Sequence, residues 1–266
     1  MNTQGATVSP FFYIGELMNI CIAGYGFVGK AHEALLKSHY KIFIVDPKYN
    51  DNRVNELDVD GVVICVPTPQ SPDGSCDMTY IHQVLDDTHP NLPVLIKSTI
   101  SIEGWEELLE KYPSHSITFS PEYLRAANYE NDMRHLKKIE FGGTGAKFWC
   151  DVFCLLLKDL ECKEFDPRVL ILNKYARNSF LATKVSWFNQ LYDLCEAYDI
   201  DYQEVADLVS SDHRIGISHT DVTRARGWGG HCFPKDTKAF LSSAKRKGID
   251  LSLLNEAVEY NNKIRS

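Results

Sequence analysis

The chain has 266 residues, a formal net charge of −8, 44% hydrophobic residues and 24% charged residues. These values are typical of a globular protein long enough for two domains. The acidic balance argues against binding to nucleic acid, which depends on basic surface. No run approaches the roughly 20 consecutive apolar residues of a membrane span, so we expect no membrane association. Residues 1–17 lack the basic start and long apolar core of a targeting signal. We therefore expect a cytoplasmic protein with reduced cysteines, in which residues 1–17 are an extension outside the fold.

The first half of the chain alternates predicted strands and helices. An apolar run at 19–23 is followed by the hexapeptide Gly24-Tyr25-Gly26-Phe27-Val28-Gly29, a helical segment and a second apolar run that ends in Asp46. Glycines at this spacing let a pyrophosphate approach a helix N-terminus, and an acid about 20 residues further on binds the ribose hydroxyls. The pattern predicts an α/β fold, with a Rossmann-like, mostly parallel sheet over residues 18–167 that binds a dinucleotide. Asp46 favours NAD over NADP, because a carboxylate repels a 2′-phosphate.

Polar residues follow the later predicted strands of this half. Thr68 comes after the apolar run 61–66, Thr99 after the strand 94–97, and Glu122 after 117–119. Each one alone could be a turn-forming or helix-capping residue. Ligands of open α/β sheets bind beyond the carboxyl ends of the strands, so the group together indicates a site there.

Residues 168–266 are predicted to be all helical. One long helix covers 168–198, on which Lys174 and Asn178 are four residues apart and share a face. The alternative is a solvated polar stripe, because Arg177 and Lys184 give the helix a wet side. The loop that follows contains Arg214, and arginine in such a loop suits a phosphate-bearing ligand.

A glycine-rich run precedes Cys232, which lies at the start of another predicted helix. Pro234 suits the first helical position, and the helix dipole and Lys235 both favour the thiolate over the thiol. The alternative is a buried structural cysteine beside a turn. The eight cysteines show no zinc-ligand spacing, and Cys150 and Cys154 are predicted to pack in the core, so no metal site is expected.

Seven motifs resemble one family, the UDP-glucose/GDP-mannose dehydrogenases, and within it the UDP-glucose 6-dehydrogenases most of all. They occur in family order over about residues 18–265, at 24–29, 65–69, 97–99, 120–125, 174–182, 214–216 and 229–236.

This resemblance implies an NAD-dependent oxidation of the C6 alcohol of a nucleotide sugar, such as UDP-glucose, to a carboxylate in two hydride transfers. Cys232 would form a thiohemiacetal and then a thioester. Lys174 and Asn178 would stabilise the oxyanion, and Glu122, Asp236 and Thr99 would position and activate water. The implied cofactor contacts are Gly24, Tyr25, Gly26, Phe27, Val28, Gly29, Asp46, Thr68, Pro69, Ser98, Thr99 and Lys235. The implied substrate contacts are Glu122, Tyr123, Leu124, Arg125, Lys174, Asn178, Arg214, Trp228, Gly229 and Gly230.

The resemblance further implies a homodimer through the helical domain, in which Arg214 reaches the nucleotide sugar of the neighbouring subunit. The chain departs from the family at Ala126, where a second Glu is usual. The family also normally continues beyond the position of Ser266 into a third α/β domain that holds the UDP, so this chain does not define the nucleotide sugar. Two alternatives remain open: a binding module completed by a separate chain, and a two-electron alcohol dehydrogenase in which Cys232 is idle.

Overall fold

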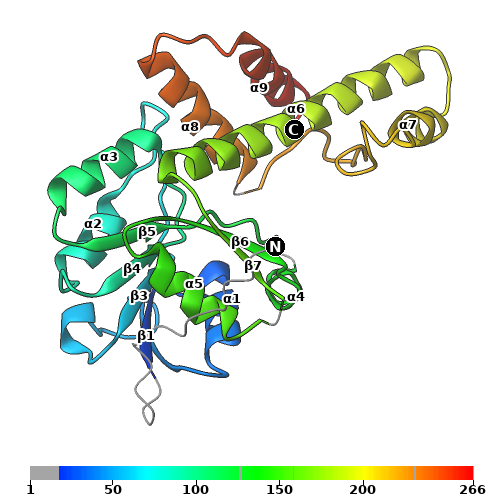
Figure 1. Ribbon diagram of the computed structural model, residues 1–266. Coiled ribbons are helices and arrows are strands. Elements are labelled where there is room, and N and C mark those ends of the chain that lie inside the picture. Colours follow the sequence, from blue (N-terminus) through cyan, green and yellow to red (C-terminus); the bar gives the residue numbers. More distant parts are fainter. Residues whose placement is uncertain (1–17, 126–127, 158, 231, 266) are drawn as a thin grey trace, which may run out of the picture. The chain divides into compact units, whose positions relative to one another are not determined.

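The computed structural model describes residues 18–265 except 126, 127, 158 and 231 (Figure 1). The predicted extension at 1–17 and the family departure at Ala126 lie outside the described residues. By contacts, the chain forms two compact units. The sheet unit comprises Met1–Thr68, Met78–Ile100 and Trp105–Leu170, and the helical unit comprises Pro69–Asp77, Ser101–Gly104 and Ile171–Ser266. The division falls within one long helix, and it assigns two short segments of the first half to the helical unit.

Within the described residues, the sheet unit is built on seven strands in the order β2-β1-β3-β4-β5-β6-β7. All neighbouring strands are parallel except β5 and β6, which confirms the predicted α/β fold with a mostly parallel sheet. The central strands are buried apolar runs, as expected of a sheet covered on both faces. Their bounds are β1 Asn19–Ala23, β2 Lys41–Val45, β3 Gly61–Ile64, β4 Pro93–Ile96, β5 Ser116–Phe119, β6 Lys138–Gly143 and β7 Glu161–Glu164.

Helices and one 3-10 turn connect these strands (Figure 1). Their bounds are α1 Phe27–Leu36, η1 Val54–Glu56, α2 Thr79–Asp86, α3 Ile102–Lys111, α4 Tyr129–Arg134 and α5 Ala146–Cys154. The core includes the fully buried Trp149 of α5, packed with apolar residues of β1 and β6. Cys150 is half-buried against this core, but Cys154 is exposed. The prediction that both cysteines pack in the core is therefore wrong for Cys154, because α5 ends at this residue.

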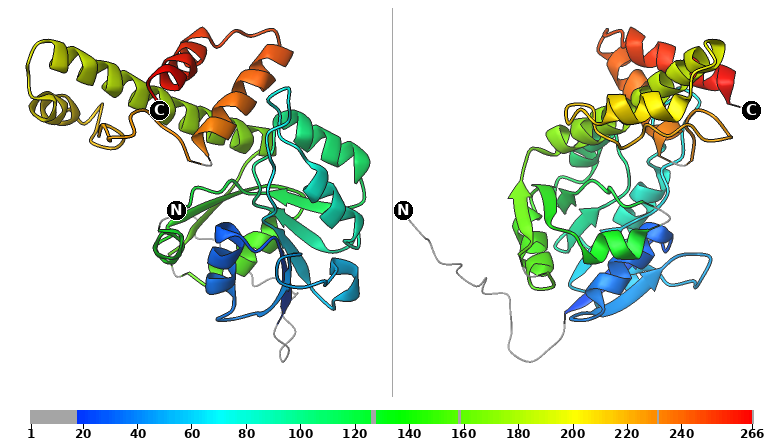
Figure 2. Two further views of the ribbon diagram at one scale, coloured as in Figure 1. Left: turned by 180° about the vertical axis from the view of Figure 1, so that it is seen from behind. Right: turned by 90° about the vertical axis from the view of Figure 1, so that its right-hand side faces the viewer.

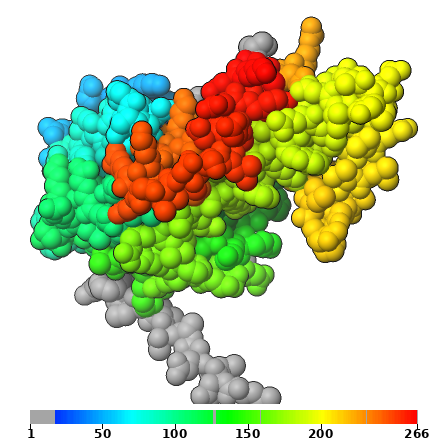
Figure 3. Space-filling model, turned by 90° about the horizontal axis from the view of Figure 1, so that it is seen from above, coloured from blue at the N-terminus to red at the C-terminus, as the bar shows by residue number. Residues whose placement is uncertain are grey.

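The helical unit contains α6 (Pro167–Ala197), α7 (Tyr202–Ser210), α8 (Phe233–Arg246) and α9 (Ser252–Ile264). Figures 2 and 3 show α9 (red) beside the middle of α6, with the C-terminal part of α6 continuing past it toward α7. The Ser186 hydroxyl of α6 links the helices, since it donates to the Ala257 carbonyl at 3.1 Å. Asp201 caps α7 by accepting the Gln203 N–H at 2.8 Å, as its place before the helix predicts. None of the described helices combines the length and apolar character needed to cross a membrane.

Candidate functional site

The glycine-rich turn joins β1 to α1 where the strand order reverses, between β1 and β3. Gly24 has a φ of 92°, and a Cβ there would lie 2.7 Å from backbone atoms of Cys65 and Val66, so only glycine fits. Gly26 caps α1, and a Cβ at this exposed residue would meet nothing within 4 Å. The helix N-terminus is therefore accessible, and its positive dipole end suits the pyrophosphate of NAD.

Asp46 brings its carboxylate back to this turn from the end of β2. Oδ2 accepts the Tyr25 N–H at 2.6 Å, and Oδ1 accepts the Lys48 N–H at 2.9 Å. The parallel register pairs Ala23 with Val45, which explains why the acid meets the turn. The glycine turn and the acid at the end of β2 thus have the arrangement that fits the phosphates and a ribose of a dinucleotide.

The predicted hydroxyl residues link the loops that follow β3 and β4. The Thr68 hydroxyl donates to the Thr99 carbonyl at 2.7 Å, and the Ser98 hydroxyl donates to the Val66 carbonyl at 2.7 Å. Thr68, Ser98 and Thr99 are all buried. The sheet unit therefore brings these three residues together, whereas Pro69 is exposed and belongs to the helical unit.

Glu122 is anchored at the end of β5 by both oxygens. Oε1 accepts the N–H groups of Tyr123 and Leu124 at 2.9 and 3.0 Å. Oε2 lies 3.3 Å from Nζ of the buried Lys97, which also donates to the Ser120 hydroxyl at 3.0 Å. A buried ion pair is costly unless hydrogen bonds support its charges, and the two backbone N–H groups on Oε1 and the Ser120 hydroxyl on Lys97 give part of that support. No role was predicted for Lys97, although a lysine directly after an apolar strand is itself a signal.

His32 of α1 completes this buried group. Its Nε2 lies 3.9 Å from Glu122 Oε2, and its Nδ1 lies 2.9 Å from the Val28 carbonyl, to which the neutral ring donates. Burial, followed by the positive charge of Lys97, lowers the pKa of His32 from 6.5 to about 4, and Glu122 opposes this shift only in part. The imidazole is therefore neutral at physiological pH. Sequence analysis did not identify His32, because one histidine in a helix carries no pattern.

The helical unit brings Cys232, Asp236 and Asn178 together. Cys232 is exposed at the N-cap of α8, and Pro234 is the second residue of this helix, one position later than predicted. Asp236, one turn further on, donates its backbone N–H to the Cys232 carbonyl at 2.8 Å. Its buried side chain accepts the Asn178 amide N–H at 2.6 Å through Oδ2. Oδ1 accepts no hydrogen bond from the described residues.

Lys174 lies one turn before Asn178 on α6 and is buried. Its charge and those of Lys235 and Asp236 act on Cys76, a buried residue that sequence analysis did not assign. Burial raises the pKa of the Cys76 thiol, whose Sγ lies 3.5 Å from the Tyr175 hydroxyl. Burial likewise raises the pKa of Tyr175. Two neutral groups thus lie beside the charged residues of this cluster.

The residues of the glycine-rich run before Cys232 differ in how closely other atoms pack against them. Trp228 is buried in a small core with Val185 and Val258, and its indole N–H donates to the Ser186 hydroxyl at 2.9 Å. Its backbone N–H and carbonyl are both bonded to the Asn261 side chain, at 2.7 and 3.0 Å, so Trp228 has a structural role here. A Cβ at Gly229 would lie 2.6 Å from the guanidinium of Arg265, whereas one at Gly230 would meet nothing within 4 Å.

The predicted arginines are exposed. Arg214 pairs with Asp212 through its Nε, 3.0 Å from each carboxylate oxygen. Arg125 pairs with Asp132 through Nε, 3.0 Å from Oδ2, and through Nη2, 2.5 Å from Oδ1. Each is thus held by a neighbouring acid at the surface of its own unit.

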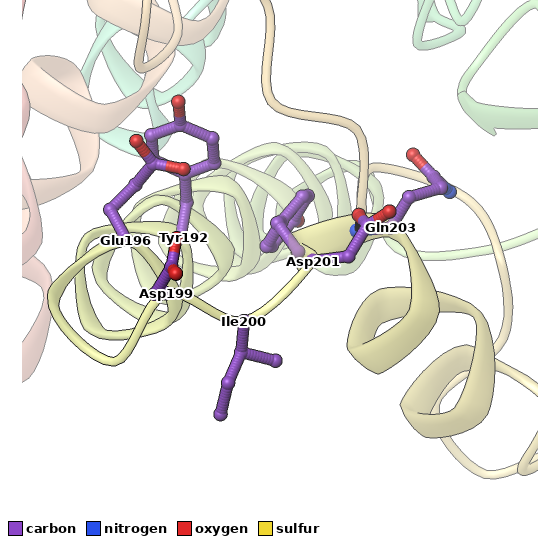
Figure 4. Close-up of a pocket in the computed structure, with 7 residues that line it drawn as sticks. Tyr192, Glu196, Asp199, Ile200, Asp201 and Gln203 are labelled. Atoms are coloured by element: carbon purple, nitrogen blue, oxygen red, sulfur yellow. Dashed lines mark hydrogen bonds between the residues drawn. The ribbon is translucent and has the colours of Figure 1, made fainter.

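A pocket at the turn between α6 and α7 contains none of the predicted site residues. Figure 4 shows its lining side chains, among them Glu196, Asp199 and Asp201. These acids do not converge on one point, since the one group of described acids, cysteines or histidines that does so is a set of three cysteines. This pocket is therefore not a candidate metal site.

Comparison with known proteins identifies both halves. Two domain models of one family match: "UDP-glucose/GDP-mannose dehydrogenase family, NAD binding domain" at residues 48–149, and its "central domain" at residues 171–263. The chain is 31% identical over 229 residues to a UDP-glucose 6-dehydrogenase of Haloferax volcanii, covering 77% of this chain and 53% of that protein. It is 29% identical over 288 residues to one of Rhizobium meliloti, covering 94% and 65%.

Among solved structures, a UDP-glucose dehydrogenase of Pyrobaculum islandicum has a TM-score of 0.82 at 24% identity, covering 97% of this chain and 70% of that chain. This likeness supports the fold alone. The chain spans about half the length of the first curated relatives it matches.

Proposed function

Because the chain belongs to the UDP-glucose/GDP-mannose dehydrogenase family, we propose that it is an NAD-dependent nucleotide-sugar 6-dehydrogenase. UDP-glucose is the proposed substrate, since the curated relatives above are named UDP-glucose 6-dehydrogenases. The observation that carries the proposal is the contact of Asn178 with Asp236, one helical turn from the exposed Cys232. These side chains come from distant parts of the sequence and supply a nucleophile, an amide donor and a carboxylate.

When bound, NAD would accept one hydride in each of two oxidations, of the alcohol and of the cysteine adduct. Cys232 Sγ would form a bond to the aldehyde carbon, and this carbon would become a thioester carbonyl after the second oxidation. Water would then add to that carbonyl, and cleavage of the C–S bond would release the carboxylic acid and restore the thiolate. Each sugar alcohol thus consumes one water and two NAD, and it yields a carboxylate, two NADH and three protons.

The neighbours of Cys232 suit these steps. The helix N-terminus of α8 favours the thiolate. The Asn178 amide has two N–H groups, of which one donates to Asp236 and the second would donate to the oxyanion. Lys174, one turn away on α6, would add positive charge, and Asp236 would accept a proton from water. The predicted roles of Glu122 and Thr99 in positioning water belong to the same proposal.

The yield of NADH per sugar tests the reaction. With limiting UDP-glucose and excess NAD, we expect two NADH and one glucuronate per sugar. One NADH with accumulation of aldehyde would indicate a two-electron alcohol dehydrogenase. No NADH would indicate a nucleotide-binding module.

The role of Cys232 is tested by Cys232→Ser. This variant should bind NAD with unchanged affinity and release no glucuronate. Cys195→Ala, at a cysteine of α6 that belongs to neither proposed site, is the control and should retain activity. Normal acid production by Cys232→Ser would refute the thioester mechanism.

We also propose that two copies associate through α6. Four large side chains follow one stripe along this helix and the turn directly after it: Phe180, Trp187 and Leu194 of α6 and Tyr198 of the turn are 69, 50, 53 and 71% exposed. Their spacings of seven, seven and four residues keep them on one face. A contiguous exposed apolar stripe of this kind is typical of a protein–protein interface, and a second copy presents the same stripe. The predicted reach of Arg214 into a neighbouring subunit depends on this dimer.

Light scattering during gel filtration tests the association. The wild-type chain should elute as a dimer, and Trp187→Glu should elute as a monomer with unchanged circular dichroism. Leu208→Glu is the control, since Leu208 is 76% exposed on α7 and lies outside the stripe. A monomeric wild-type chain, or dissociation by Leu208→Glu alone, would contradict the proposal.

A further inference from the structure

Three cysteine thiols converge at one edge of the sheet unit, although they belong to no predicted site. Cys150 and Cys154 are one turn apart on α5, and Cys162 lies on the edge strand β7, against which α5 packs. The three Sγ atoms lie within 4.8 Å of one another. The Cys150–Cys154 separation is 4.0 Å, and the Cys154–Cys162 separation is 3.1 Å.

These separations bring all three sulfurs within reach of one ion. Non-bonded carbon atoms, which are smaller than sulfur, find their optimum at about 3.5–4.0 Å, so sulfurs at 3.1 Å are close for thiols that merely pack together. Thiolates bound to zinc at about 2.3 Å with tetrahedral angles lie about 3.8 Å apart. The Cys150–Cys154 separation is close to this value, and the Cys154–Cys162 separation would lengthen as the two sulfurs bind the ion. A disulfide would use only two of the sulfurs and would leave the third without a role.

The exposure of the three cysteines and the residues around them are consistent with binding of a metal ion. Cys150 and Cys162 are half-buried against the apolar core of the sheet unit, while Cys154 is exposed and open to an arriving ion. No fourth histidine, cysteine or acid of the described residues joins the group. A set of three protein ligands with one open position can hold water or an external ligand at the metal.

We propose that Cys150, Cys154 and Cys162 bind one zinc(II) ion as a three-thiolate site with an open fourth position. Soft thiolate ligands select thiophilic ions such as zinc over magnesium, calcium and manganese. Each thiol releases its proton as it binds the metal. The site ties the end of α5 to β7, so an effect on the stability of this edge is expected when zinc is bound.

Cobalt(II) titration of the reduced, chelator-treated full chain tests the site. We expect one cobalt per chain, an intense sulfur-to-cobalt charge-transfer absorption, and its loss when one equivalent of zinc is added. Cys154→Ser is the primary variant, because Cys154 is exposed and its replacement leaves the core intact. It should lose the absorption and bind zinc at least about tenfold more weakly, since one of three ligands is missing. Cys150→Ser is a second variant with the same expected result.

Two control variants separate this site from the other cysteines. Cys195→Ser, at a buried cysteine of α6, and Cys232→Ser should both retain the cobalt absorption. Absence of metal uptake by the reduced wild type, or retention of the absorption by Cys154→Ser, would overturn the proposal. Loss of the absorption in Cys232→Ser alone would also overturn it, since the metal would then be at Cys232. A Cys154–Cys162 disulfide in protein isolated without reductant, together with no metal uptake after reduction, would assign the pair to redox chemistry instead.

Discussion

Lowering the pH from 8 to 5 should destabilise the sheet unit through one residue, His32. The ring is fully buried, and its Nδ1 side is occupied by the Val28 carbonyl. Two charges face it: Lys97 at the end of β4 lowers its pKa, and Glu122 after β5 raises it. Burial is the largest cause, so the folded chain takes up a proton here only at a pKa of about 4, against 6.5 for an ordinary histidine.

The sign and size of the effect follow from proton linkage. Above pH 6.5 the ring is neutral in both states, and its contribution to stability is fully present. Between pH 6.5 and 4 the unfolded chain binds a proton that the folded chain does not, so stability falls as the pH falls. A shift from 6.5 to about 4 corresponds to about 3 kcal/mol at the acid limit. At pH 5 the loss is about 2 kcal/mol.

The assay is urea unfolding at several pH values between 8 and 5, followed by circular dichroism. Wild type and His32→Gln are compared, and the expected signature is a pH slope that the variant lacks, whatever its stability at pH 8. His39→Gln, at an exposed histidine that follows α1, should keep the wild-type slope. If His32→Gln and wild type lose equal stability between pH 8 and 5, the reasoning from burial fails.

The sequence alone predicted those features of the fold that depend on neighbouring residues. The glycine turn, the strand that ends in Asp46, and the start of α8 at Cys232 each depend on residues within about one supersecondary unit, where backbone rules decide. The long helix α6 was predicted at 168–198 and is observed at Pro167–Ala197, because no glycine or proline interrupts its interior.

Contacts between distant residues could not be predicted in the same way. The Asn178–Asp236 hydrogen bond joins residues 58 apart, and the neighbourhood of Lys97 and Glu122 depends on the order of β4 and β5. The cysteine cluster depends on β7, whose sequence Glu-Cys-Lys-Glu has no apolar run because it is an exposed edge strand. Without that strand, Cys162 had no predicted position, and Cys150 and Cys154 looked like ordinary core residues.

Three substitutions test the remaining inferences. Asp46→Ala should weaken NAD binding by about tenfold or more, the equivalent of about 1.4 kcal/mol, as measured by calorimetry, and should leave nucleotide-sugar affinity unchanged. Gly24→Ala places a Cβ 2.7 Å from backbone atoms at a φ of 92°, so the free energy of unfolding should fall by more than the about 1–3 kcal/mol that backbone strain alone costs. Gly216→Ala is the control, because its Cβ meets open space and only the strain of its positive φ remains. Asp236→Asn keeps an oxygen that can accept the Asn178 amide N–H and removes only the charge, so kcat should fall by about 10²–10⁴-fold with little change in KM. The melting temperature of Asp236→Asn should stay level or rise, because a buried carboxylate is costly to desolvate. If Asp236 had only a structural role, the variant would lose stability and keep its kcat. Asp207→Asn, at an exposed acid of α7, is the matched control, and a kcat for Asp236→Asn within about threefold of it would remove Asp236 from the proposed chemistry.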